Sequence, residues 1–141
     1  MVMKNPGFLT IFLCVLFIVS CDKDDDEVSE RFRFLTGSVW ASDSLLVNGF
    51  DGSFSGGPLE DFKGDAKFSE DGTGTFGSYA GTWKFEQDEA VLVITSPDLP
   101  LAVLSAQIAE LTAISLKITT VFPDPADFTE QLNIRMTFKA K

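Results

Sequence analysis

Few side chains in this sequence could carry out catalysis. The chain of 141 residues has no histidine and two cysteines, Cys14 and Cys21. Without an imidazole, neither a Ser-His-Asp nor a Cys-His nucleophile can be assembled. Zinc and copper sites of the usual histidine and cysteine kind lack their ligands as well. We therefore expect no cofactor, no metal site and no enzymatic activity.

Carboxylates are the remaining candidates, since paired aspartates or glutamates can act as acid and base. The 21 acidic residues fall mostly in expected turns and in the run Asp22 to Glu27, where carboxylates are typically solvated. Nothing in that run would fix its oxygens into a calcium cage. Gly52, Gly56 and Gly57 lie in a loop that no helix follows, so they predict no phosphate site. These patterns favour binding over catalysis.

The negative charge of the chain limits its partners further. The formal net charge is −10 at neutral pH, so the chain repels nucleic acids and anionic membrane surfaces. We therefore expect no nucleic-acid partner, and nothing in the sequence identifies a protein partner. Contact with a membrane must come from a feature other than surface charge.

The first twenty residues have the pattern of a secretory signal peptide. Lys4 precedes the apolar run Phe8 to Ser20, which is shorter than the roughly 20 apolar residues that span a bilayer. The residues Ile18, Val19 and Ser20 directly before Cys21 resemble the lipobox of bacterial lipoproteins. This resemblance implies cleavage before Cys21 and its acylation, and several acyl chains on one residue anchor stably. The alternative is an ordinary signal peptide with a chance cysteine.

The acidic run Asp22 to Glu27 predicts a disordered spacer, because like charges repel and bury nothing. We expect residues 21–34 to form a tether, with Val28 to Phe34 as one helical turn or a leading strand. A cysteine followed by Lys23 and several acids resembles the lipoprotein export signal of one large Gram-negative phylum. That resemblance implies an outer-membrane lipoprotein facing the cell surface. A periplasm-facing anchor and a plain spacer are the alternatives.

Residues 35–141 alternate between apolar and polar residues with period two, and turn residues recur at short intervals, which is typical of an all-β domain. The clearest strand, Gln131 to Lys139, has its even-numbered residues inward. The strand Phe62 to Phe68 likewise has its even-numbered residues inward, Gly64 included. We count eight antiparallel strands and predict a closed up-and-down barrel, because closure removes exposed strand edges.

Three other segments lead to further predictions about inward residues and secondary structure. The first strand, Gly37 to Val47, is less regular, with Trp40, Ser42 and Ser44 inward. Ile114 is expected inward at the start of the strand Ile114 to Val121. Pro100 to Leu111 fits helical and strand spacing alike; its alanines favour a helix, and its place between two strands favours a strand.

Four segments in order along the chain resemble the lipocalin-like lipoproteins of Gram-negative envelopes. They are TGSVW at Thr36 to Trp40, FSEDGTGTF at Phe68 to Phe76, GTWKF at Gly81 to Phe85 and IAELTAISLKI at Ile108 to Ile118. The resemblance covers the chain from about Leu35 to its C-terminus. It implies a calycin-type barrel that holds a small molecule.

The candidate ligand-binding residues are the large side chains expected inside the barrel and two phenylalanines expected over its open end: Trp40, Phe50, Phe54, Phe62, Phe68, Phe76, Trp83, Phe85, Met136 and Phe138. Small inward residues such as Gly74 beside large ones could leave a cavity for one apolar ligand. A packed core is the alternative. In that case the barrel is a structural or protein-interaction module, which meets its partner through the loops Asn48 to Asp61 and Phe122 to Thr129.

Overall fold

A computed structural model describes residues 27–124 and 126–141 of the chain. The signal peptide over residues 1–20, the acylated Cys21 and most of the acidic run lie outside the described residues, and they stay predictions. Within the described part, neither helix is long and apolar enough to cross a membrane.

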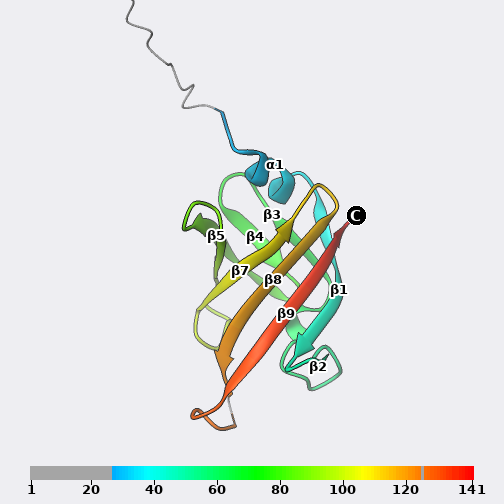
Figure 1. Ribbon diagram of the computed structural model, residues 1–141, viewed down its shortest axis with the longest axis vertical. Helices are drawn as coiled ribbons and strands as arrows, with labels where there is room; N and C mark the ends of the chain where they lie inside the picture. The colour runs from blue at the N-terminus through cyan, green and yellow to red at the C-terminus, as the bar shows by residue number, and fades with distance from the viewer. Residues whose placement is uncertain (1–26, 125) are drawn as a thin grey trace, which may run out of the picture.

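One antiparallel sheet dominates the described chain (Figure 1). Eight of its strands follow one another around a barrel, and pairing of the first with the last closes it. The all-β, eight-stranded, up-and-down barrel predicted from the sequence is therefore confirmed, and its architecture is lipocalin-like. The elements in chain order are α1 (Glu30–Thr36), β1 (Val39–Val47), β2 (Phe50–Asp51), the 3₁₀ helix η1 (Glu60–Phe62), β3 (Asp65–Phe68), β4 (Thr73–Phe76), β5 (Tyr79–Glu86), β6 (Val91–Thr95), β7 (Val103–Leu111), β8 (Ser115–Pro123) and β9 (Gln131–Ala140).

The short strand β2 stands outside this barrel, since it pairs back only onto the end of β1. Most of the segment Pro100 to Leu111 forms β7, which confirms the strand rather than the helix, while its first three residues belong to the preceding loop. The segment before the barrel forms α1. For Val28 to Phe34 a helical turn and a leading strand were both open, and the structure has the helix.

The closing seam between β1 and β9 contains an irregularity that corrects one prediction. The register shifts between Ser42 and Ser44, as in a β-bulge. Beyond it, Ser44 pairs with the outward Thr137, whereas Leu45 pairs with the buried Met136. Because one extra residue reverses the alternation of a strand, Leu45 faces the core in place of Ser44.

Two further inward assignments are wrong at strand ends. Gly64, which was expected inward, is exposed with a φ of 122° in the turn before β3. Its neighbour Phe62 lies in η1 rather than in a strand, but its side chain is buried as expected. Ile114 is 74% exposed because β8 begins one residue later, at Ser115. Alternation predicts a side chain's direction only where the extended backbone continues.

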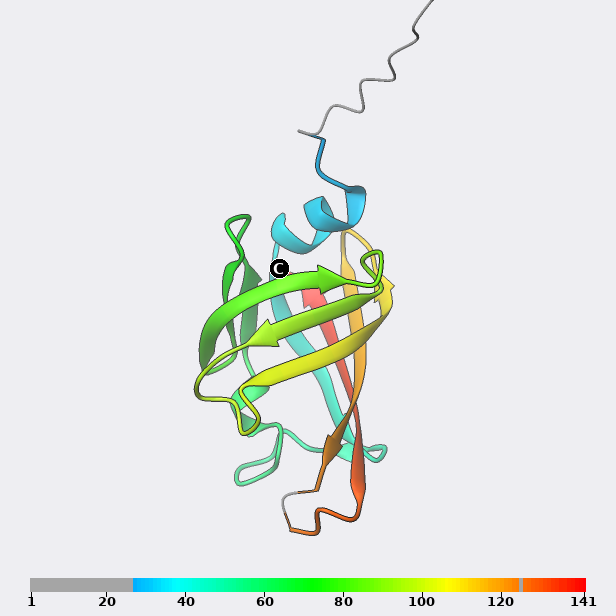
Figure 2. The ribbon, with the colours of Figure 1, turned by 90° about the vertical axis from the view of Figure 1, so that its left-hand side faces the viewer.

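Helix α1 lies across one end of the barrel (Figure 2). The side chain of Ser29 caps it by accepting a hydrogen bond from the backbone N–H of Phe32 at 3.0 Å. The ring of Phe32 then packs on Trp83, with centroids 5.6 Å apart, and Leu35 is fully buried. The apolar face of this short helix therefore joins the core of the barrel.

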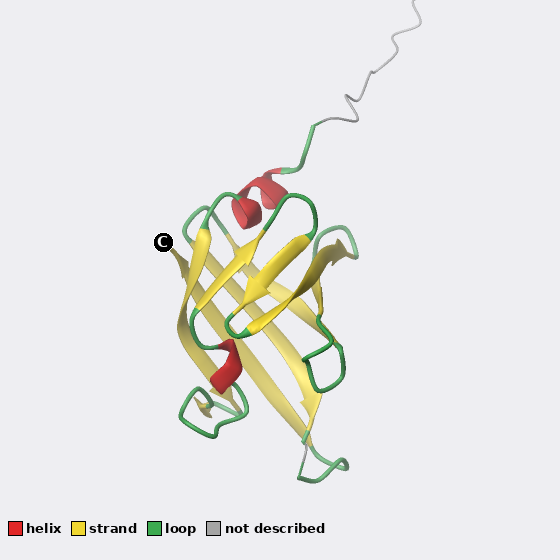
Figure 3. Ribbon diagram, turned by 180° about the vertical axis from the view of Figure 1, so that it is seen from behind, coloured by secondary structure: helices red, strands yellow, loops and turns green. Residues whose placement is uncertain are grey.

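The opposite end of the barrel is formed by loops and by η1 (Figure 3). It consists of residues 48–64, 77–78, 96–102 and 124–130, in which residue 125 is not described. We call this end the mouth. The two ends thus differ, since a helix packs over one and irregular chain surrounds the other.

Candidate functional site

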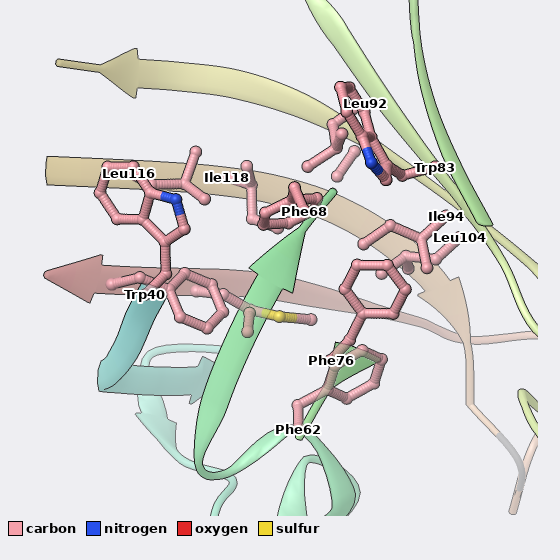
Figure 4. Close-up of a cluster of buried hydrophobic side chains, with 14 of the residues drawn as sticks. Trp40, Phe62, Phe68, Phe76, Trp83, Leu92, Ile94, Leu104, Leu116 and Ile118 are labelled. Carbon is pink, nitrogen blue, oxygen red and sulfur yellow. The ribbon is translucent and has the colours of Figure 1, made fainter. Parts of the chain in front are cut away.

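The deep interior of the barrel is occupied by its own side chains. Phe68 lies with its ring centroid 5.2 Å from that of Phe76 and 5.8 Å from that of Trp83. Figure 4 shows these rings pointing into one shared interior together with Trp40. The space left among the central side chains is about 10 Å³, which is the room one water needs. The centre is therefore a packed core rather than an open cavity.

Most of the predicted ligand-binding residues belong to this core. Seven of them are buried in the core: Trp40, Phe62, Phe68, Phe76, Trp83, Met136 and Phe138. Phe85 is half-buried beside Trp83, with ring centroids 5.4 Å apart. Phe50, in β2, is 78% exposed, and Phe54, in the loop after β2, is 57% exposed. Phe62 and Met136 have a further role, because they also border a pocket at the mouth.

The pocket at the mouth has a volume of about 270 Å³. It lies between the loop before β3, the loop between β6 and β7, and the adjoining ends of β8 and β9. Most of its lining is apolar, and the residues that border it are Gly57, Pro58, Leu59, Asp61, Phe62, Tyr79, Leu99, Pro100, Val103, Leu104, Phe122, Leu132, Ile134 and Met136. It is thus an apolar recess that opens at the end of the barrel away from α1.

Backbone hydrogen bonds hold the loop before β3 in place over the pocket. The N–H of Gly52 donates to the carbonyl oxygen of Leu45 at 2.8 Å, and the N–H of Leu59 donates to the carbonyl oxygen of Gly52 at 2.9 Å. Leu59 is only 1% exposed. A side chain added at Gly52 would collide with Val47, so this loop needs the glycine where it touches the barrel.

The loop between β6 and β7 is anchored in a similar way. The buried hydroxyl of Ser96 donates to the carbonyl oxygen of Ala80 on β5 at 2.7 Å. The N–H of Ser96 donates to the carbonyl oxygen of Ala102, which closes the loop on itself. Leu99 at its centre is buried and forms part of the pocket wall. Two anchored loops therefore give this pocket walls that are held in place.

Tyr79 and Asp61 supply the polar edge of the pocket. The Tyr79 hydroxyl donates to an Asp61 carboxylate oxygen across 3.4 Å, and the tyrosine ring lies 4.9 Å from that of Phe62. Burial raises the pKa of Tyr79 above its ordinary value, and the negative charges of Asp61 and Asp98 raise it further. Both carboxylates therefore act on the same edge of the pocket.

A larger hollow of about 620 Å³ lies outside the barrel, along β1, β7, β8 and β9. Its wall includes Gln107, Thr119, Asn133 and Arg135, which are outward side chains of a twisted sheet. We favour the smaller mouth pocket as the ligand site, because it is more enclosed than this outer hollow and its wall belongs partly to the barrel interior.

Alternation along strands did not identify several residues that form the pocket. Leu59 and Leu99 lie in loops, in the short stretches GGPLED and SPDLPL. A single large apolar residue within a loop of glycines, prolines and acids is the sequence signal that could have identified them. Tyr79, Phe122 and Leu132 lie at strand ends, where burial depends on which loops come together.

No group of three or more histidine, cysteine, aspartate or glutamate side chains within the described residues is arranged to hold a metal ion. No protein-family model matches the chain, and no curated protein matches its sequence.

Proposed function

We propose that this protein is a lipid-anchored lipoprotein of a Gram-negative outer membrane whose barrel binds one small apolar molecule at its mouth. The observation that supports binding is the apolar pocket of about 270 Å³ between Leu59, Leu99 and Leu132. Pockets for drug-sized ligands typically measure about 300–1,000 Å³. The ligand is therefore at the small end of this class, such as an alkyl chain or a flat aromatic molecule.

The position of the pocket agrees with anchoring through Cys21. The described chain begins at Glu27, directly before α1, and α1 covers the end of the barrel opposite the mouth (Figure 1). Acyl chains on Cys21 would therefore attach the barrel from its α1 end and leave the mouth free to face solvent. The resemblance of Ile18 to Cys21 to a lipobox supports the anchor, and the acidic run supports display on the cell surface.

A protein-interaction module is the second candidate, because the centre of the barrel is filled. Three phenylalanines at the mouth end are largely exposed: Phe50 at 78%, Phe54 at 57% and Phe128 at 79%. Exposed aromatic side chains on neighbouring loops often mark a contact with another protein. In this case the barrel would present its loops and bind no small molecule.

A neutral apolar dye separates the two candidates. The chain from Glu27 to Lys141 contains α1, every strand and the whole described core, so it suits binding studies in the absence of detergent. We expect Nile red to bind it with a fluorescence increase. Leu132→Trp, which fills the pocket, should abolish that signal, whereas Val121→Trp on the outer face of β8 should leave it unchanged. Absence of dye binding to the unsubstituted chain would leave the interaction module as the better candidate.

The anchor needs the complete chain, expressed in a Gram-negative host. We expect mass spectrometry of the membrane fraction to show a chain that begins at Cys21 and carries acyl groups. Cys21→Ser should lack these groups and appear outside the membrane fraction. Detection of an unacylated mature chain would rule out the lipoprotein, and protease treatment of intact cells would report which side of the membrane the barrel faces.

A further inference from the structure

All but one of the charged side chains around the mouth pocket are negative. Among the residues that line it, Asp61 is the one that carries a full charge at neutral pH, and there is no lysine or arginine. The loops of the mouth end contain seven carboxylates, Asp51, Glu60, Asp61, Asp98, Asp124, Asp127 and Glu130, and one cation, Lys63. An anionic ligand would therefore enter the pocket against repulsion.

The carboxylates of the mouth are not neutralised by ion pairs. The four ion pairs within the described residues use Glu86, Glu110, Asp43 and Asp65, which all lie on strands of the barrel. The negative charge of the mouth therefore persists at neutral pH. It would be felt most strongly inside a recess with apolar walls, because such walls do not screen it as water does.

Asp61 itself is placed to accept a hydrogen bond from a ligand. Its carboxylate accepts a hydrogen bond from the Tyr79 hydroxyl across 3.4 Å. This distance is long for a hydrogen bond between two oxygens, so the carboxylate can accept a shorter one from a ligand. The ring of Tyr79 borders the same recess, and the face of a tyrosine ring attracts cations. A carboxylate and an aromatic ring at the edge of an apolar recess together suit one kind of headgroup, a protonated amine.

We propose that the ligand of the mouth pocket is a small cationic amphiphile, with its apolar body among Leu59, Leu99 and Leu132 and its ammonium group at Asp61. This inference rests on the proposed function, because it names the chemical class of molecule that the same pocket takes. It disfavours short fatty acids, because their carboxylate would meet Asp61 at the same edge.

Three probes of matched chain length test the proposal: octylamine, octanol and octanoate. Each would displace Nile red from the chain Glu27 to Lys141 at neutral pH, where the amine is protonated and the acid is ionised. We expect octylamine to bind about tenfold more tightly than octanoate at low ionic strength, with octanol between them. Added salt should narrow the difference, because it screens charges that face solvent.

Asp61→Asn provides the decisive variant, since it removes the charge and keeps the shape. We expect it to reduce the preference for octylamine over octanoate severalfold without weakening octanol, and the remaining mouth carboxylates to account for what preference is left. The matched control is Asp88→Asn, which removes one carboxylate from the turn between β5 and β6 at the α1 end. Asp88 has a φ of 55°, which asparagine adopts readily, so this control should fold and keep the preference for the amine.

The results separate the two proposals. If neither Nile red nor any of the three probes binds, the proposed function fails and this inference fails with it. If octanoate binds as tightly as octylamine, the apolar site stands and the cationic class is overturned. If Asp61→Asn keeps the full preference for the amine, the headgroup does not lie at Asp61 and the inference is also overturned.

Discussion

The indole nitrogen of Trp40 donates a hydrogen bond of 2.9 Å to the backbone carbonyl oxygen of Leu35, and both residues are fully buried. This bond joins the first strand of the barrel to the last turn of α1. The final carbonyl groups of a helix have no partner within the helix, so the indole satisfies one that would otherwise be buried alone. Helix α1 is thus a structural part of the barrel.

Trp40→Phe should weaken the barrel by removing this bond. The substitution keeps an aromatic ring in the core but leaves the Leu35 carbonyl without its partner, which costs about 1–3 kcal/mol. Urea unfolding followed by far-UV circular dichroism measures the change. Phe128→Leu, at a position that is 79% exposed, should change stability by less than about 0.5 kcal/mol. Equal stability of the two variants would show that the bond contributes nothing.

Phe68→Ala tests whether the central aromatic side chains are core or ligand contacts. Phe68 packs against Phe76 and Trp83 and is 2% exposed, so the substitution should cost about 3–5 kcal/mol of unfolding free energy. Phe50→Ala, in the same predicted set but 78% exposed, should cost less than about 0.5 kcal/mol. A Phe68→Ala variant with unchanged stability and lost Nile red binding would instead place the ligand in the centre of the barrel.

Tyr79 reports the electrostatics of the mouth directly, because it is the single tyrosine of the chain. Burial raises its pKa above the ordinary value of 10.0, and Asp61 adds to the shift by its charge and hydrogen bond. We therefore expect tyrosinate absorbance to develop at higher pH in the folded than in the unfolded protein. Asp61→Asn should move the pKa part of the way back, and Asp88→Asn should not move it.

The same shift makes the free energy of unfolding depend on pH. The folded state holds the Tyr79 proton more tightly than the unfolded state. The stabilisation that this provides is complete below about pH 10 and is lost as the pH rises through the folded pKa. Tyr79→Phe should therefore lose less stability than the unsubstituted protein above that pH. Identical losses in both proteins would contradict the raised pKa.

Gly81→Ala should strain the contact between β5 and β6. A Cβ atom at this position would collide with the backbone carbonyl oxygen of Thr95 on the neighbouring strand. Crowding of this kind typically costs about 1–3 kcal/mol. Thr82→Ala, at the exposed neighbouring residue, should cost about 0.5 kcal/mol. Thermal unfolding of the two variants side by side would show the difference, and equal melting temperatures would argue against the close approach.

Local alternation was sufficient to predict the barrel. On β9, Ile134, Met136 and Phe138 are buried, and the residues between them are more exposed, as a period of two requires. Such a pattern depends only on neighbours along the chain, so the sequence by itself determined most of the strands, most of their inward faces and, through the need to remove edges, a closed eight-stranded sheet. It also determined the acidic character of the protein and its lack of histidine.

Tertiary structure decided the details that arise between distant segments. The bulge between Ser42 and Ser44 depends on how β1 meets β9, nearly a hundred residues later, and it reverses which side chain faces the core. Whether the inward side chains fill the barrel depends on how their volumes interlock, which no single strand reveals. The mouth pocket likewise exists only because Leu59, Leu99 and Leu132, from three separate segments, are buried or half-buried around one recess.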